Sequence, residues 1–434
     1  MAETPFLFIF LLIGVLTFLI EMAQYISERL SIPQVLGEIL LGIILGPTFL
    51  RILSFSDPSY SILSTIGLVS SKEIASATEI IAFISEMAGL LLLLQVGVEV
   101  DLKLLRKLGK DSTNVAIGGT ILPLIAGITF GLIFSKTVAV EEFTTFDTAL
   151  FLGVGLTATS IGISIRVLIE LGRFGAKSTG ILIGAAIIDD ILALVLFSVA
   201  LGFVEEEKAF GAGALVDMTI IFAKILSFAL IALMIHFVLQ KWIVNSLLKT
   251  KDTYKRLTFV MGLVFVFAWL AGTLELSPII GAFVAGVLTT QNEELKELIE
   301  DLITPLSKWL IPFFFISVGF RVDLGVVSGM EVVALSLILA LIAILSKLIG
   351  AGIGALANGN TKMEAIEIGL GMAPRGEVII VIATTGLSIG VFSPAVFGML
   401  VLTVAITAIF VPLSMKMVIT RQKTEDEKPE TLKL

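Results

Sequence analysis

Apolar stretches of about twenty residues recur along nearly the whole chain, with short polar or charged segments between them. A run of that length can cross the hydrocarbon core of a bilayer as a helix. The pattern therefore predicts an all-α membrane protein with about 13 transmembrane helices. They are expected at 5–24, 33–53, 79–99, 112–135, 146–171, 177–203, 215–238, 255–275, 277–290, 303–320, 331–356, 363–390 and 394–418, followed by a short charged tail at 421–434 that we expect to be disordered.

The composition agrees with this class and excludes several kinds of chemistry. The chain has 434 residues, of which 57% are hydrophobic and 15% are charged, whereas a soluble domain has roughly 25% charged residues. Because there is no cysteine, disulfides, thiolate catalysis and Cys-ligated zinc are excluded. The single histidine, His236, leaves no histidine cluster for a metal. We expect no cofactor and no nucleic-acid partner, and membrane lipid around the helices.

The positive charges predict how the helices are oriented. An odd number of spans puts the two termini on opposite sides of the membrane. If the C-terminus is cytoplasmic, most lysines and arginines lie in cytoplasmic loops, as the positive-inside rule requires. The N-terminus is then outside. In this arrangement the outer loops keep only Arg51, Lys72, Lys136, Lys208 and Arg321.

Two short patterns occur twice along the chain. The sequence V-G-x-x-V-D-L stands at 96–102 and again, 222 positions later, at 318–324. The pattern G-x4-G stands at Gly37 and Gly42 and again at Gly281 and Gly286. The alternative is chance similarity between apolar segments, which two echoes in the same order disfavour. Seven helices separate the partners, so the copies would be inverted in the bilayer, an arrangement typical of secondary transporters.

The strongest chemical signal is a pair of adjacent aspartates, Asp189 and Asp190, in the middle of an apolar run. A charged side chain near the bilayer centre costs about 2.5–3.5 kcal/mol on insertion scales. The pair therefore predicts a site that binds a cation, a proton, or each in turn; a structural ion pair within the bundle is the alternative. Adjacent helix positions point about 100° apart, so the two carboxylates are expected to have different roles.

Two neighbouring features offer partners for these aspartates. Thr157, Thr159 and Ser160 lie in mid-membrane among glycines, which predicts an unwound helix whose oxygens would bind an alkali cation. The alternative is an intact helix whose hydroxyls bond its own carbonyls. Lys347 lies in the middle of the run 331–356, and we interpret it as a buried partner for one of the aspartates. A cation that displaced this lysine would favour release of its proton.

A second helix break is predicted in the run 363–390. Pro374 and Gly376 interrupt the helix, with Arg375 and Glu377 as buried charges beside the break. These charges would neutralise each other or cap the freed ends of the half-helices. Glu377 is more open to a role near the ion site. Elsewhere, Arg166 is expected to pair with an acid across the bundle.

Four segments in order along the chain resemble those of monovalent cation:proton antiporters, in the branch that holds prokaryotic sodium/proton exchangers and potassium-efflux systems. The segments are Arg29–Glu38 (RLSIPQVLGE), Thr157–Ser160 (TATS), Ile187–Ile191 (IIDDI) and Met372–Glu377 (MAPRGE). The resemblance implies inverted repeats with two crossed unwound helices in a transmembrane domain at 1–420. It implies a dimerisation part made of helices 1–3 and 8–10, a linker helix at 215–238, and an ion-transporting core at 112–203 and 331–418.

The resemblance also implies what individual residues do. Asp190 matches the essential ion-binding aspartate, Asp189 the aspartate before it in electrogenic members, Lys347 the buried lysine that pairs with it, and Thr159 the threonine at the unwound crossing. A sodium ion would then bind at Asp190, Asp189 and Thr159. The Asp-Asp pair, where one-for-one exchangers usually have Asn-Asp, implies two protons exchanged for one sodium.

The resemblance implies a transporter and not an enzyme. It implies a homodimer in the cell membrane of a prokaryote that exchanges Na⁺ (or Li⁺) for H⁺ by an elevator-type movement, for sodium and pH homeostasis. The nearest alternative is a K⁺/H⁺ antiporter or a potassium-efflux exchanger. An intramembrane aspartyl protease would carry its aspartates on separate helices, and a sodium-coupled solute symporter would need a larger cavity.

Overall fold

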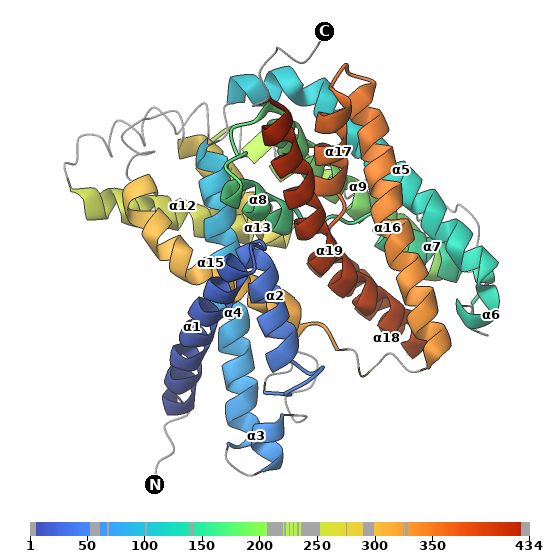
Figure 1. The fold of residues 1–434 in the computed structure, drawn as a ribbon, viewed down its shortest axis with the longest axis horizontal. Helices are drawn as coiled ribbons and strands as arrows, with labels where there is room; N and C mark the ends of the chain where they lie inside the picture. The colour runs from blue at the N-terminus through green and yellow to red at the C-terminus, as the bar shows by residue number, and fades with distance from the viewer. Residues whose placement is uncertain are drawn as a thin grey trace. The chain divides into compact units, whose positions relative to one another are not determined.

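The structure is a computed structural model, and it describes most of the chain (Figure 1). Throughout the described residues the backbone forms helices and the loops that join them. The described ranges are 6–52, 61–66, 69–99, 102–138, 140, 143–205, 252–274, 276–289, 299–323, 325 and 329–426, with scattered residues between 220 and 235.

The principal helices follow one another without an intervening sheet in the described ranges. They are α1 (Phe6–Arg29), α2 (Gln34–Leu45), α4 (Ser71–Glu99), α5 (Leu102–Ile133), α7 (Thr145–Gly155), α8 (Ile161–Glu170), α9 (Lys177–Glu205), α12 (Thr253–Thr273), α13 (Pro278–Thr289), α15 (Thr304–Phe320), α16 (Met330–Leu356), α17 (Lys362–Gly371), α18 (Glu377–Ser388) and α19 (Pro394–Asp426). Short helices α3 (Ile62–Thr65) and α6 (Ser135–Val138) and a π-helical turn at Ile299–Ile303 complete the described part.

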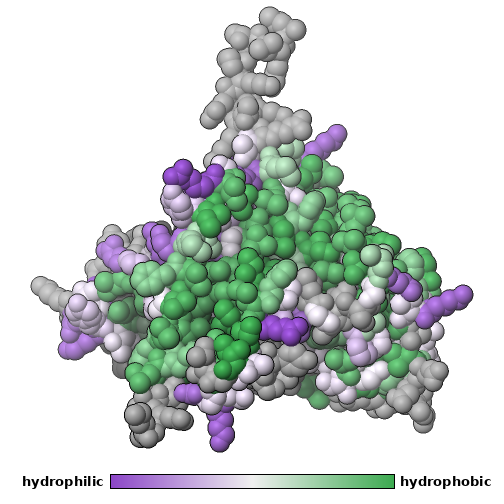
Figure 2. All heavy atoms as spheres, turned by 60° about the horizontal axis from the view of Figure 1, so that its bottom comes forward, coloured by the Kyte–Doolittle hydropathy of each residue, from purple (hydrophilic) through white to green (hydrophobic). Residues whose placement is uncertain are grey.

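Eight of the described helices are long and apolar enough to cross a membrane, and four more are shorter and apolar. Large hydrophobic side chains stand exposed on their outer faces, among them Phe10 and Phe18 on α1. On the face seen in Figure 2, hydrophobic side chains cover a broad area and hydrophilic ones lie mostly towards its margins. This is the surface of a protein whose solvent is lipid rather than water.

The predicted spans agree with the helices, and several bounds needed correction. Twelve of the thirteen runs match described helices, two of them as broken pairs. The run 215–238 falls largely outside the described residues, so the count of thirteen stays a prediction. The helix expected at 33–53 ends at Leu45, because Gly46 precedes Pro47 and a residue before proline disfavours the helical conformation.

α1 continues to Arg29, and three other helices extend at least eight residues beyond the prediction at one end. α4 begins at Ser71 and not at 79, because Ser70 and Glu73 bond each other's backbone N–H and side chain at the helix start. α5 begins at Leu102 and so includes polar residues that were expected to form a loop. α19 continues to Asp426, so the first six residues of the expected disordered tail are helical; residues 427–434 are outside the described part.

Contacts between Cα atoms divide the chain into two units. Unit 1 is Met1–Ile81, Leu108–Glu205 and Phe315–Leu434, and unit 2 is Ala82–Lys107 and Glu206–Phe314. The two units differ from the expected division, because α1 and α2 group with the helices of the expected ion-transporting core. The assignment of helices to a dimerisation part and a core stays a prediction.

The two repeated sequence patterns meet in space as close helix crossings. In unit 1, α2 crosses α15 so closely that a Cβ on Gly42 would lie 2.9 Å from the Cα of Gly319. In unit 2, α13 crosses α4 with the same closeness, since a Cβ on Gly286 would lie 3.0 Å from the Cα of Gly97. Each crossing therefore joins one copy of the first pattern to the opposite copy of the second. The inverted repeat is thus a feature of the fold as well as of the sequence.

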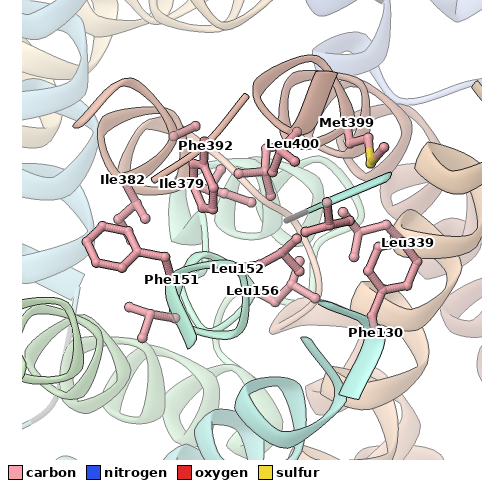
Figure 3. Packing of buried hydrophobic residues seen from close by; sticks show 14 of the residues in the cluster. Phe130, Phe151, Leu152, Leu156, Leu339, Ile379, Ile382, Phe392, Met399 and Leu400 are labelled. Carbon is pink, nitrogen blue, oxygen red and sulfur yellow. The ribbon is translucent and has the colours of Figure 1, made fainter. Parts of the chain in front are cut away.

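A hydrophobic cluster in unit 1 fills the space on one side of the helix breaks (Figure 3). Phe151 of α7 packs edge-on against Phe392, with ring centroids 5.9 Å apart. α16, α18 and α19 add further apolar side chains to the cluster, and α18 packs against both α7 and α19. The labelled members of the cluster are Phe130, Phe151, Leu152, Leu156, Leu339, Ile379, Ile382, Phe392, Met399 and Leu400.

α5 and α16 approach at two glycines, and this contact yields a stability prediction. A Cβ on Gly350 would lie 2.2 Å from the carbonyl oxygen of Gly118, so Gly350→Ala must push the helices apart. We expect a loss of about 1–3 kcal/mol, measured as a lower midpoint temperature of unfolding in detergent. Gly109→Ala on α5 is the control, because no atom of another described helix lies within 4 Å of a Cβ built there. Equal midpoints for the two variants would contradict the close approach.

Candidate functional site

Two broken helices frame the site, and the two are built alike. The first consists of α7, which ends at Gly155, and α8, which begins at Ile161; the second consists of α17, which ends at Gly371, and α18, which begins at Glu377. Both first halves start with a capping box, Thr144 with Asp147 and Thr361 with Glu364. The breaks predicted at Thr157–Ser160 and at Pro374–Gly376 are confirmed.

The two breaks cross each other and are joined by hydrogen bonds. The Ser160 backbone N–H donates to the Pro374 carbonyl at 2.8 Å, and the Ser164 hydroxyl donates to the Gly371 carbonyl. A Cβ on Gly376 would lie 2.6 Å from the Ser160 hydroxyl oxygen, so only glycine fits there. These bonds satisfy backbone groups that unwinding would otherwise leave unpaired in hydrocarbon.

Arg375 is completely buried and closes the crossing. Its guanidinium donates to the Ala158 carbonyl in the first break and to the Ala343 carbonyl of α16 at 3.2 Å. Its own backbone N–H donates to the Thr407 hydroxyl of α19 at 3.2 Å. A positive charge therefore lies against the carbonyls that follow the C-terminal end of α7, where the helix dipole favours a cation.

Asp189, near the middle of α9, is completely buried, and its carboxylate is enclosed by donors. Lys347 Nζ lies 2.7 Å from each carboxylate oxygen, and Lys347 is also completely buried. The Thr120 hydroxyl of α5 reaches Oδ1 and the Thr159 hydroxyl reaches Oδ2, each at 2.7 Å. The structure thus brings Asp189, Lys347 and Thr159 together beside the crossing.

The other predicted site residues lie less directly at this centre. Asp190 is half-buried, and its charge interacts with Lys347. The Thr157 hydroxyl donates to the Val154 carbonyl near the end of α7 at 2.7 Å. Ser160 joins the site through its backbone bond at the crossing. The side chain of Glu377 lies outside the described residues, so its predicted role stays a prediction.

Comparison with known proteins now decides the family. Residues 9–421 match the family described as sodium/hydrogen exchanger, transmembrane. The chain belongs to this family. As curated relatives, it is 32% identical to a probable Na⁺/H⁺ antiporter, GerT of Bacillus cereus, over 88% of this chain and 92% of GerT. It is 30% identical to the high-affinity Na⁺/H⁺ antiporter NhaS3 of Synechocystis, over 96% of this chain and 91% of NhaS3.

A solved structure supports the fold of this exchanger. The sodium proton antiporter MjNhaP1 of Methanocaldococcus jannaschii superimposes with a TM-score of 0.61, covering 96% of this chain and 99% of that one, at 18% sequence identity. The expected antiporter fold and the family resemblance are therefore confirmed. The chain is a multi-span membrane protein of a transporter family.

Thr120 is the residue of the exchanger's site that sequence reasoning missed. Its hydroxyl also donates to the Ala116 carbonyl of its own helix at 2.8 Å. Any helical threonine can form this bond, so the residue type alone indicates no further role for Thr120. The only signal is its position directly after Gly118 and Gly119, since small residues mark a close helix contact. That contact brings α16, and with it Lys347, to the site.

The arrangement can hold a small cation or a proton, but it offers no resident metal site of the usual kind. Among the described residues, no group of three or more His, Cys, Asp or Glu side chains is placed so that it could hold a metal ion. The oxygens present are two adjacent carboxylates, hydroxyls and the carbonyls of the breaks. Such hard oxygens suit an alkali cation, which in this family is cargo and not a cofactor.

The ion pair makes a stability prediction for the exchanger. Asp189→Asn leaves Lys347 buried without a counter-charge, and Lys347→Met leaves Asp189 in the same state. Each single change should lower the free energy of unfolding by about 3–5 kcal/mol, because an unpaired buried charge is more costly than none. The double variant should regain most of this loss, as measured by thermal unfolding in detergent. Simple addition of the two losses would show that the charges do not compensate each other.

Proposed function

We propose that the protein exchanges Na⁺ (or Li⁺) for H⁺ across the cell membrane of a prokaryote, as a homodimer that serves sodium and pH homeostasis. The exchange is electrogenic and uses an elevator-type alternating-access movement. The N-terminus lies outside and the C-terminus in the cytoplasm. One observation supports this above all: a buried Asp189–Lys347 pair lies beside two crossed helix breaks, with a second carboxylate, Asp190, adjacent to it.

The two aspartates divide the work in this proposal. Asp189 is held by Lys347 and two hydroxyls, so its charge is already compensated. Asp190 is half-buried and faces a different direction on α9. Asp190 is therefore the carboxylate at which the transported cation or its competing proton binds first, with Asp189 and Thr159 as further oxygen ligands. Thr157 and Ser160 supply main-chain or hydroxyl oxygens from the break.

Competition for Asp189 gives the coupling. A sodium ion that reaches Asp190 and Asp189 displaces Lys347 from the carboxylate. The displaced ammonium group, buried and without a counter-charge, releases its proton to water. A second proton leaves Asp190 as sodium binds there. Two protons therefore leave when one sodium ion binds, and each transport cycle moves a net charge.

A second cation specificity is the runner-up. The Na⁺/H⁺-K⁺ antiporter GerN of Bacillus cereus is 30% identical to this chain over 91% of its length. Its name includes K⁺, so a K⁺/H⁺ or potassium-efflux activity is the alternative. The Asp-Asp pair and its buried lysine favour sodium, since potassium-efflux systems usually have Gln-Asp.

The decisive experiment is transport in proteoliposomes with Na⁺, Li⁺ or K⁺ across a range of pH. Wild type should move protons in response to Na⁺ or Li⁺, and Asp190→Asn should fall to the level of empty liposomes, because the neutral amide neither binds a proton nor attracts the cation. Asp111→Asn is a matched control. The Asp111 carboxylate lies 4.0 Å from Lys177 Nζ and takes no part in the Asp189–Lys347 pair. Exchange retained by Asp190→Asn would refute its role.

Electrogenicity has its own test. Valinomycin with equal K⁺ on both sides clamps the voltage and should speed sodium/proton exchange, because the charge moved otherwise builds an opposing potential worth about 2.3 kcal/mol per charge per 100 mV. Lys347→Gln should reduce this response, since one of the two protons is then missing. Identical rates with and without valinomycin would show one-for-one exchange.

A further inference from the structure

The hairpin formed by α1 and α2 is joined to α8 by a charged contact that the proposed ion site does not use. Arg166 of α8 lies 3.7 Å from a carboxylate oxygen of Glu38 on α2. Glu38 is completely buried, and the same oxygen accepts a hydrogen bond from Gln24 of α1 at 2.6 Å. Its other oxygen, also buried, has no hydrogen-bond partner in the described part of the chain. A buried carboxylate left so incompletely bonded is costly.

A second acid completes the cluster from the α8 side. Glu170 lies one turn after Arg166 on the same helix and bonds it at 3.0 Å. Its second oxygen accepts the Gln34 backbone N–H at 2.9 Å, at the start of α2, where a helix dipole favours a negative charge. The Gln34 side-chain oxygen in turn accepts from Arg166 at 3.3 Å. The first turn of α2 is thus held by two opposite charges of α8.

The turn of the hairpin is also held by α19. Lys416 donates to the Ser31 carbonyl in the turn between α1 and α2. The hairpin is therefore joined through charged side chains to two helices, α8 and α19, of which α8 also forms half of the crossing. All of these residues lie towards the end of the hairpin that the positive-inside pattern places in the cytoplasm.

We propose that Glu38, Arg166 and Glu170 form a charge latch that holds the α1–α2 hairpin to the ion-binding helices in the state seen here and opens when these helices move. This rests on the proposed function, because an elevator movement requires one set of helices to slide against another.

The geometry suits a contact that must break in every cycle. The Glu38–Arg166 distance is too long for a hydrogen bond, so separation loses an attraction but no hydrogen bond between these two groups. After separation Arg166 keeps Glu170, and Glu38 keeps Gln24. A permanent bridge in the same unit looks different: Glu367 accepts from Arg173 at 2.9 Å and from Ser178 at 3.0 Å, so both of its oxygens are bonded.

Cross-linking tests the latch, because the chain has no native cysteine. Ser31→Cys with Lys416→Cys places a pair across the hairpin and α19, and a short bis-maleimide joins them only while the hairpin is docked. Adding Glu38→Gln should slow cross-linking roughly two- to fivefold, the effect of losing one ion pair. Adding Glu21→Gln should leave the rate unchanged, since Glu21 is an exposed acid on α1 of the same hairpin.

Transport separates a latch from a merely structural role. In the cysteine-free chain, Glu38→Gln should change the kcat of exchange by a similar factor while the KM for Na⁺ stays constant, because Glu38 does not touch the cation. The fully cross-linked pair should lose exchange. An unchanged cross-linking rate in Glu38→Gln, or full exchange by the cross-linked protein, would overturn the latch. Failure of wild type to exchange Na⁺ for H⁺ would instead refute the proposed function.

Discussion

The compensation of one buried charge shapes the part of this protein that holds the two helix breaks. Asp189 is completely buried, so its carboxylate depends on the compensating charge of Lys347 beside it. Lys347 reaches it because α16 approaches α5 at Gly350, which lies three residues later on the same helix face. The glycine contact is therefore needed to bring the lysine to the aspartate, and each of these two buried charges would be unfavourable without the other.

The crossing of the broken helices is nearly symmetric in backbone and strongly asymmetric in chemistry. The half-helices of the second repeat begin and end 216 to 218 positions after those of the first. By the same offset of 216, Thr159 corresponds to Arg375 and Asp189 corresponds to Ala405. In one repeat a hydroxyl bonds a carboxylate, whereas in the other a guanidinium bonds backbone carbonyls. The two similar helix breaks thus provide one carboxylate site. In the second repeat Arg375 takes the place of the hydroxyl and bonds backbone carbonyls instead.

The sequence predicted the features that are energetically unfavourable whatever the helix packing, because such features can be recognised from residue type and position alone. Charges in an apolar run, and Pro374 with Gly376 within a helix, are unfavourable wherever they occur, so Asp189, Lys347 and both breaks could be found. Partners depend on how helices pack, and sequence could not choose among them. Reasoning from the residues left Lys347 between two aspartates and treated Thr157 and Thr159 alike, although their hydroxyls bond different groups. Only the family resemblance assigned Lys347 to Asp189 and singled out Thr159, and Thr120 was overlooked. The bounds of α2, α4 and α5 depended on capping and turns, which periodicity does not report.

The bonding of the buried acids also distinguishes helix contacts that are expected to persist from helix contacts that can break. Asp189 and Glu367 each have both carboxylate oxygens bonded by side chains of the same unit. Removing a cationic partner without another cation to replace it would leave a bare charge, so these bridges resist simple separation. Glu38 has one oxygen bonded within its own hairpin and only a longer contact to Arg166. Complete bonding favours a rigid body and incomplete bonding favours a sliding surface, so the proposed movement fits best at the contact between the α1–α2 hairpin and α8.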